Sequence, residues 1–180
     1  MDDAITQWIN AGAGKSALLD AVMVAVTQYG VSLLVALVAL QWWSRHERLH
    51  VRHTCVAAGL SFLLGLGLNQ LILLFLHRVR PYDAGVSHLI ISRSTDWSFP
   101  SDHATASFAI ALAFLLQGFG RRGSAFLAAG LLVCFSRIYV GTHYVSDVLG
   151  GAVTGALAAC VVRGLYRQGT RIDRLVTGIL

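Results

Sequence analysis

Two polar residues in the last quarter of the sequence have a spacing suited to proton transfer. His143 and Asp147 are four residues apart, so on a helix they lie on one face. A carboxylate in that position can keep one imidazole nitrogen protonated and leave the other nitrogen free to attack an electrophile. His143 is therefore a candidate nucleophile, and Asp147 is the carboxylate expected to orient it.

A second histidine and several anion-binding groups accompany this pair. Ser101 and Asp102 come immediately before an apolar run, which is typical of a helix N-terminus. The backbone amides of a first helical turn bind phosphate, and His103 in that turn is a candidate general acid. Arg80 and Arg137 can each bind phosphate oxygens through two parallel hydrogen bonds.

The elements that must position these residues are apolar helices. The chain has 180 residues, of which 56% are hydrophobic and only 13% charged, and its mean hydropathy is +0.65. Soluble domains typically carry about 25% charged residues. Several apolar runs reach the roughly 20 residues that a helix needs to cross a bilayer. The sequence predicts an all-α integral membrane helical bundle, with residues 1–180 forming a single domain.

About five transmembrane helices are expected, with one long polar loop at residues 77–101. The predicted spans are residues 17–43, 51–76, 102–119, 124–140 and 144–166. Residues 1–16 place Ile5, Trp8 and Ile9 on one helical side, which indicates a short interfacial helix lying on the membrane. A frayed terminus is the alternative interpretation of that segment.

Basic residues divide unevenly between the two ends of the predicted bundle. The larger group comprises Arg45, Arg48, Arg52, Arg121, Arg122, Arg163, Arg167, Arg171 and Arg174, and the smaller comprises Lys15, Arg78, Arg80, Arg93 and Arg137. Because cytoplasmic loops carry an excess of Lys and Arg, the larger group is expected to face the cytoplasm. The candidate site then faces outward. The arginines form no stripe or basic tail, so the net charge of +5 does not indicate a nucleic-acid partner.

The polar residues also stand in the order of a family signature. The chain resembles the type 2 phosphatidic acid phosphatase (PAP2) superfamily, which includes the vanadium haloperoxidases. That signature reads Lys-x6-Arg-Pro, Pro-Ser-Gly-His and Ser-Arg-x5-His-x3-Asp. The third part is complete from Ser136 to Asp147, the second reads Pro-Ser-Asp-His and ends at His103, and the first is reduced to Arg80-Pro81. The motif region covers residues 69–147.

Two departures from the signature define a branch of the superfamily. Leu73 stands at the lysine position and Asp102 at the glycine position. Arg78 or His77 is a candidate substitute for the lysine, although neither has its register. With the stretch around Pro100, these departures resemble the bacitracin-resistance-type undecaprenyl-diphosphate phosphatases.

The resemblance implies a hydrolase that acts on a lipid phosphate in the bacterial inner (cytoplasmic) membrane. The roles of the family's motif residues make His143 the nucleophile that forms a phosphohistidine, Asp147 its orienting carboxylate and His103 the general acid. The phosphate-binding residues carried over are Arg80, Ser101, Asp102 and Arg137. The substrate implied is an isoprenyl diphosphate, undecaprenyl diphosphate, recycled for cell-wall peptidoglycan synthesis. No metal and no other cofactor are implied.

Other functions remain open on the sequence alone. A phosphatidate or phosphatidylglycerol-phosphate phosphatase would carry the same motif. A non-catalytic lipid-phosphate binding or transport protein and a vanadate-dependent oxidase are the alternatives from other classes. Within the long loop, Asp83, His88, Arg93 and Asp96 either select the head group or only solvate the surface. Asn69 and Gln70, inside the second predicted span, are expected to support the site by hydrogen bonding. No sequence feature defines an oligomeric state.

Overall fold

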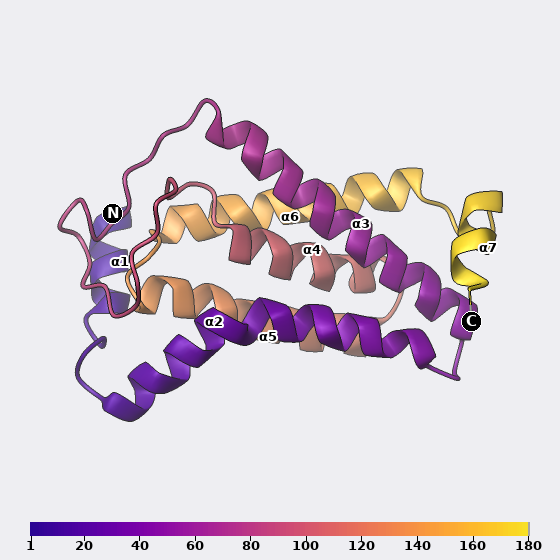
Figure 1. Ribbon diagram of the computed structural model, residues 1–180, viewed down its shortest axis with the longest axis horizontal. Coiled ribbons are helices and arrows are strands. Elements are labelled where there is room, and N and C mark those ends of the chain that lie inside the picture. Colours follow the sequence, from indigo (N-terminus) through magenta and orange to yellow (C-terminus); the bar gives the residue numbers. More distant parts are fainter. Residues whose placement is uncertain (180) are drawn as a thin grey trace.

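The computed structural model describes residues 1–179 as a bundle of helices (Figure 1). They are α1 (Asp2–Asn10), α2 (Ala17–Leu40), the 3-10 helix η1 (Gln41–Trp43), α3 (Arg48–Leu73), α4 (Asp102–Leu116), α5 (Gly120–Tyr139), α6 (Val145–Leu165) and α7 (Arg171–Thr177). No strand occurs in residues 1–179. The all-α fold predicted from the sequence is confirmed.

Three helices in the described part of the chain are long and apolar enough to cross a membrane, judged by length and composition. They are α2 continued through η1, α3 and α6. The helix α4 is apolar but has only 15 residues, a rise of about 22 Å. The helix α5 has 20 residues, but Arg121, Arg122 and Arg137 near its two ends lower its hydropathy. The observed bounds differ from the predicted spans by a few residues.

The short helix α4 lies inside the bundle, packed against α3, α5 and α6 (Figure 1). Its buried residues are Ala104, Thr105, Ala106, Ser107, Ala109, Ile110, Ala111, Ala113 and Phe114. Most of these side chains are small, which lets the neighbouring backbones approach closely. Because protein surrounds α4 on several sides, its length is set by packing against its neighbours and not by the full bilayer thickness.

Two glycines of α6 allow the closest of these contacts. A Cβ atom at Gly155 would lie 2.4 Å from the carbonyl oxygen of Thr105, and one at Gly151 would lie 2.3 Å from the carbonyl oxygen of Ser101. The glycines are four residues apart and so share one face of α6. The backbone of α4, including its N-terminus, therefore rests directly on α6.

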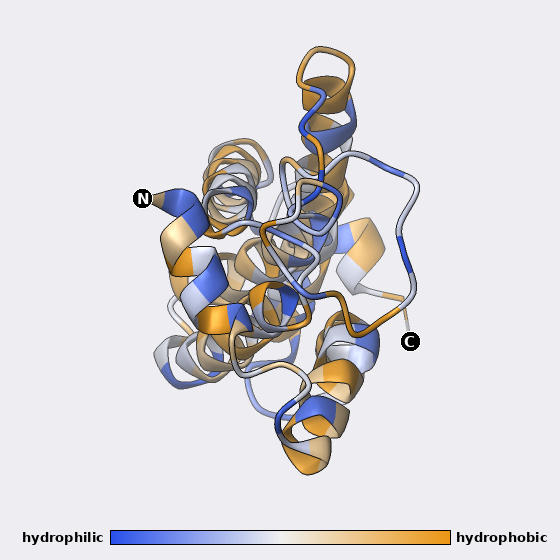
Figure 2. Ribbon diagram, turned by 90° about the vertical axis from the view of Figure 1, so that its left-hand side faces the viewer, coloured by the Kyte–Doolittle hydropathy of each residue, from blue (hydrophilic) through white to orange (hydrophobic). Residues whose placement is uncertain are grey.

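The connection between α3 and α4, residues 74–101, folds over one end of the bundle beside α1 (Figures 1 and 2). Hydrophilic residues lie along this connection and on α1, whereas the helices behind them are mostly hydrophobic (Figure 2). The Asn10 side chain donates to the carbonyl oxygens of Tyr139 at 2.7 Å and His88 at 2.9 Å. These bonds join α1, the connection and the end of α5.

The helix α1 is the short N-terminal helix that the sequence predicts. Ile5 and Trp8 are exposed on it, at 45% and 79%, whereas Ile9 packs against buried residues of the bundle. An exposed apolar side next to a polar end of the bundle is suited to the membrane interface.

At the opposite end, a buried polar cluster fixes α7 to α3. Nδ1 of His53 lies 2.8 Å from Oδ1 of Asp173, and the Tyr166 hydroxyl donates to the same oxygen at 2.7 Å. The imidazole of His53 also stacks on the Tyr166 ring, with 4.7 Å between centroids. The C-terminal helix is thereby held far from the polar connection.

We expect Gly155→Ala to lower the melting temperature of the detergent-solubilised protein. Its new methyl group must push α4 away from α6, and overpacking of this kind costs about 1–3 kcal/mol. Gly67→Ala is the matched control, since no atom lies within 4 Å of a Cβ at that position of α3. Thermal unfolding followed by tryptophan fluorescence compares the two variants, and equal melting temperatures would contradict the α4–α6 contact.

Candidate active site

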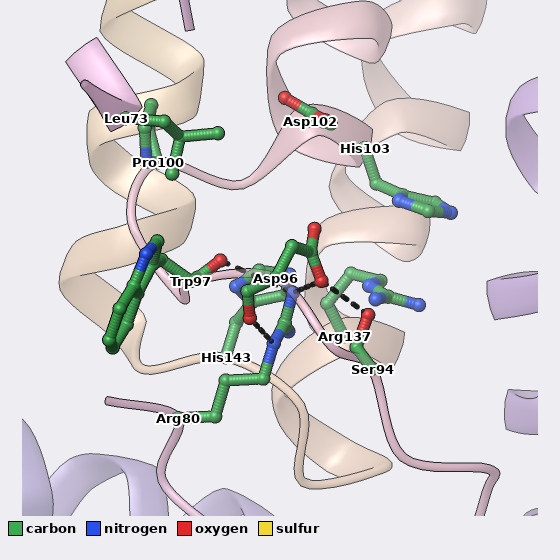
Figure 3. Close-up of a pocket in the computed structure, with 10 residues that line it drawn as sticks. All are labelled: Leu73, Arg80, Ser94, Asp96, Trp97, Pro100, Asp102, His103, Arg137 and His143. Atoms are coloured by element: carbon green, nitrogen blue, oxygen red, sulfur yellow. Dashed lines mark hydrogen bonds and ion pairs between the residues drawn. The ribbon is translucent and has the colours of Figure 1, made fainter. Parts of the chain in front are cut away.

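The ends of three helices and the α3–α4 connection enclose a polar pocket of about 110 Å³ (Figure 3). Arg80 comes from the connection, His103 from the first turn of α4, Arg137 from the last turn of α5, and His143 from the link between α5 and α6. The other residues that line it are Leu73, Ser94, Asp96, Trp97, Pro100 and Asp102. The structure thus brings both predicted histidines and both predicted arginines into one pocket.

His143 is buried, with 3% of its surface exposed, and its orientation is defined by two contacts. Nδ1 lies 2.8 Å from the carbonyl oxygen of Ser98, and Nε2 lies 3.4 Å from a guanidinium nitrogen of Arg80. Because a carbonyl oxygen only accepts, Nδ1 carries the proton and Nε2 keeps its lone pair. His143 therefore presents an unprotonated nitrogen to the pocket.

The surroundings of His143 also keep its ring neutral. Burial lowers the pKa of His143 to about 4, and the charges of Arg137 and Arg80 act in the same direction. The nearby Asp147 carboxylate opposes them and raises the pKa. The nitrogen that faces the pocket is thus available for nucleophilic attack at neutral pH.

Asp147 lies behind His143 and outside the pocket lining. Its Oδ2 atom is 3.6 Å from Nδ1 of His143, longer than a hydrogen bond. The same oxygen accepts hydrogen bonds from the Ser98 hydroxyl at 2.5 Å and from the Tyr144 amide at 2.8 Å. Asp147 therefore stays at ion-pair distance from His143, the residue that the sequence predicts it to orient, while the direct hydrogen-bond partner of Nδ1 is the Ser98 carbonyl and Asp147 also holds the Ser98 side chain.

Arg78 neutralises the buried Asp147 carboxylate. One guanidinium nitrogen donates to Oδ1 of Asp147 at 2.7 Å, and the other donates to Oδ2 of Asp2 at 2.7 Å. The guanidinium carbon lies 3.8 Å from the centre of the Tyr144 ring, a cation–π contact. Arg78 therefore does not replace the signature lysine, and it connects α1 to the site instead.

The two arginines of the pocket differ in how their donors are used. Arg80 donates to the carboxylate of Asp96 at 2.9 Å and to the carbonyl oxygen of Thr142 at 2.9 Å. Arg137 makes one long contact to the Thr27 hydroxyl, at 3.4 Å, and its buried Nε atom has no hydrogen-bond partner within residues 1–179. Arg137 therefore has donors available for an anion in the pocket.

Ser101 and Asp102 begin α4, as the sequence predicts. Ser101 is the N-cap residue and fully buried, and its hydroxyl oxygen has no hydrogen-bond partner in the described chain. Asp102 lines the pocket, and its Oδ1 atom accepts from the side-chain amide of Asn69 at 2.7 Å. Asn69 also donates to the Thr105 hydroxyl at 2.9 Å. Asn69 thus has the supporting role that its position inside an apolar helix indicated, whereas the side chain of Gln70, for which the same role was expected, is exposed.

Leu73 and the polar residues of the long connection lie in different environments. Leu73, the last residue of α3, makes an apolar wall of the pocket at the position of the signature lysine, and Asp96 of the connection lies inside the pocket. His88 and Asp83 lie outside the lining; the former pairs its backbone with Asn10, and the latter forms an exposed ion pair with Arg93. Asp96 is the one member of this polar set that reaches the pocket.

No three His, Cys, Asp or Glu side chains within residues 1–179 form a group suited to a metal ion. The acidic residues that line the pocket are Asp96 and Asp102, and each accepts from a neighbouring donor. The sequence expectation of a site without metal remains a prediction.

Comparison with known proteins places this geometry in a family. The family model described as the PAP2 superfamily matches residues 52–171 of the chain. The chain is 36% identical to undecaprenyl-diphosphatase BcrC of Bacillus subtilis (strain 168), covering 87% of this chain and 80% of that protein. It is 33% identical to phosphatidylglycerophosphatase B of the same organism, covering 59% of this chain and 57% of that protein.

A solved structure has the same fold. The crystal structure of the transmembrane PAP2-type phosphatidylglycerolphosphate phosphatase from Bacillus subtilis superposes with a TM-score of 0.67 at 24% identity, covering 94% of this chain and 86% of that one. The family match spans most of the helical bundle and includes every lining residue of the pocket. The chain therefore belongs to the PAP2 superfamily.

Proposed function

We propose that this protein is a membrane phosphatase that converts undecaprenyl diphosphate to undecaprenyl phosphate and inorganic phosphate. The observation that carries the proposal is His143, a neutral imidazole whose Nε2 lone pair faces a pocket with two arginines. The 36% identity to undecaprenyl-diphosphatase BcrC supports the substrate. Residues 1–180 act as a single domain in this proposal.

In the first step, Nε2 of His143 attacks the terminal phosphorus of the diphosphate. The bond from that phosphorus to the bridging oxygen breaks, and its electron pair leaves with undecaprenyl phosphate. His103, which lines the same pocket, supplies the proton that the leaving oxygen needs. The product of this step is a phosphohistidine at position 143, and the nearby Asp147 carboxylate stabilises the positive imidazolium.

In the second step, water hydrolyses the phosphohistidine. His103, now neutral, takes a proton from the attacking water, and the bond from phosphorus to Nε2 of His143 breaks. Inorganic phosphate leaves, and the lone pair of His143 is restored. The two histidines line the same pocket from different elements, which suits an acid that becomes a base between the steps.

Positioned positive charge accounts for catalysis without a metal in this scheme. Phosphoryl transfer spreads negative charge over the equatorial oxygens, which cations and amides can stabilise. Arg137 offers a buried Nε donor, and Ser101 and the first-turn amides of α4 lie at the same end of the bundle. Arg80 supplies the second cation.

The proposed location is the bacterial inner membrane, with the site on the outer face. The excess of arginines at the end opposite the site supports this orientation. In this arrangement α4 and α5 complete a set of five spans with α2, α3 and α6. Surrounding helices shield the short α4 from lipid.

A phosphatidylglycerol-phosphate phosphatase is the second candidate. The 33% identity to phosphatidylglycerophosphatase B favours it, and the catalytic groups of the pocket suit either lipid. Leu73 and Asp102 stand in the pocket lining at the positions of the signature lysine and glycine, and their resemblance to the undecaprenyl-diphosphate phosphatase branch favours the diphosphate.

We expect the purified protein in detergent to release phosphate from undecaprenyl diphosphate faster than from phosphatidylglycerol phosphate or phosphatidate, with EDTA present. His143→Ala should reduce this rate at least roughly a thousandfold, since the covalent step is lost. Preference for a glycerolipid would be consistent with the proposed mechanism and would contradict the proposed substrate. No EDTA-resistant release from any of the three lipids would favour a binding or transport role.

We expect Arg78→Met to move the acid limb of the kcat/KM profile to higher pH by roughly 0.5–1 unit. Without the Arg78 charge, Asp147 stabilises protonated His143 more strongly and raises its pKa. The active, neutral imidazole is then lost at a higher pH as the pH falls. Arg78→Lys keeps the positive charge and should return the acid limb to its wild-type pH. A uniform loss of rate with an unmoved limb would mean that Arg78 only supports the fold.

A further inference from the structure

Every donor of Arg80 has a partner in this structure. The guanidinium group has five N–H bonds. Nε donates to the carbonyl oxygen of Asp96 at 3.0 Å. One terminal nitrogen contacts the Thr142 carbonyl oxygen at 2.9 Å and Nε2 of His143 at 3.4 Å. The other terminal nitrogen contacts the Asp96 carboxylate at 2.9 Å and the Trp97 carbonyl oxygen at 3.3 Å. A phosphoryl group can bind Arg80 only by displacing one of these acceptors.

The Asp96 carboxylate is the acceptor that a phosphoryl group can displace. It is the one anion among these acceptors, so a phosphoryl oxygen would replace it as another negatively charged acceptor. Its side chain is 56% exposed, whereas that of Arg80 is 5% exposed. The carbonyl oxygens are part of the backbone, whereas the carboxylate belongs to an exposed side chain that can rotate into solvent. Figure 3 shows this carboxylate between Arg80 and Ser94 in the pocket.

The surroundings of Asp96 also keep its carboxylate in the charged form. The Ser94 hydroxyl donates to the same Oδ1 atom that binds Arg80, at 2.5 Å. Burial raises the pKa of Asp96, but the Ser94 hydrogen bond and the Arg80 charge outweigh it and leave the pKa below the ordinary value. The carboxylate is therefore ionised at neutral pH.

We propose that the Asp96 carboxylate competes with the phosphoryl group for Arg80 and thereby weakens retention of inorganic phosphate. This inference rests on the proposed function, since it assigns Arg80 to the phosphate. Displacing the carboxylate penalises substrate and product by the same factor. The lipid substrate is concentrated in the bilayer by its chain, whereas free phosphate has no such anchor. The equal penalty on affinity therefore lowers occupancy by free phosphate more than occupancy by the lipid, whose concentration in the bilayer is high.

The test is the affinity of the detergent-purified protein for inorganic phosphate, measured by isothermal titration calorimetry. We expect Asp96→Asn to bind phosphate about tenfold more tightly than the wild type, since it keeps the shape and removes the competing charge. Asp83→Asn is the matched control, because it removes a carboxylate from the same connection that pairs with Arg93 outside the pocket. It should bind phosphate as the wild type does.

Ser94→Ala is the second variant, since it keeps the Asp96 charge and removes one of its two side-chain donors. It should tighten phosphate binding less than Asp96→Asn. Equal affinity in Asp96→Asn and Asp83→Asn would overturn the competition, as would the absence of phosphate binding in all proteins. Weaker binding in Asp96→Asn would also overturn it and make Asp96 a residue that orders Arg80 for the phosphate.

Calorimetry separates this inference from the proposed function. Phosphate binding does not require a particular lipid, so it is measured on the same preparation whose turnover of undecaprenyl diphosphate is known. Turnover that survives His143→Ala would contradict the proposed function. Normal His143-dependent turnover with unchanged phosphate affinity in Asp96→Asn would contradict the role of Asp96 alone.

Discussion

The hydrogen bond from Nδ1 of His143 to the carbonyl oxygen of Ser98 sets the chemistry of the pocket. At 2.8 Å, it fixes both the tautomer and the direction of a buried ring. Burial alone would keep the imidazole neutral but would leave either nitrogen free to carry the proton. The carbonyl removes that ambiguity, so the lone pair faces the arginines. A main-chain acceptor can do this because its geometry follows from the path of the backbone.

That path is stabilised by elements far apart in the sequence. Ser98 is held by Asp147 at the start of α6, Asp147 by Arg78, and Arg78 by Asp2 on α1. The amide of Ser101 donates to the carbonyl oxygen of Asp147 at 3.0 Å, which joins the N-terminus of α4 to the same turn. The packing of the helices and the orientation of His143 therefore depend on the same contacts, and α1 helps to support the site.

Local spacing explains what could be predicted from the sequence. The helical bundle follows from apolar runs, and the gathering of His103 and His143 follows from polar residues at the ends of those runs. Ser98 could not be predicted, and Asp96 could not be separated from Asp83, His88 and Arg93, because these residues act through contacts within an irregular connection that has no periodicity. The number of spans was also uncertain from hydropathy, since α4 is short and lies among other helices. Sequence patterns report local periodicity, whereas these features depend on tertiary packing.

The most direct test of the account is to look for phosphate on His143. Undecaprenyl diphosphate labelled with ³²P in its terminal phosphate is mixed with the enzyme and quenched in alkaline detergent, and the labelled peptides are mapped. We expect an alkali-stable, acid-labile label on the peptide that contains His143. The label should be absent from His143→Ala. A label on another residue, or turnover by a wild-type enzyme that never becomes labelled, would contradict the covalent step.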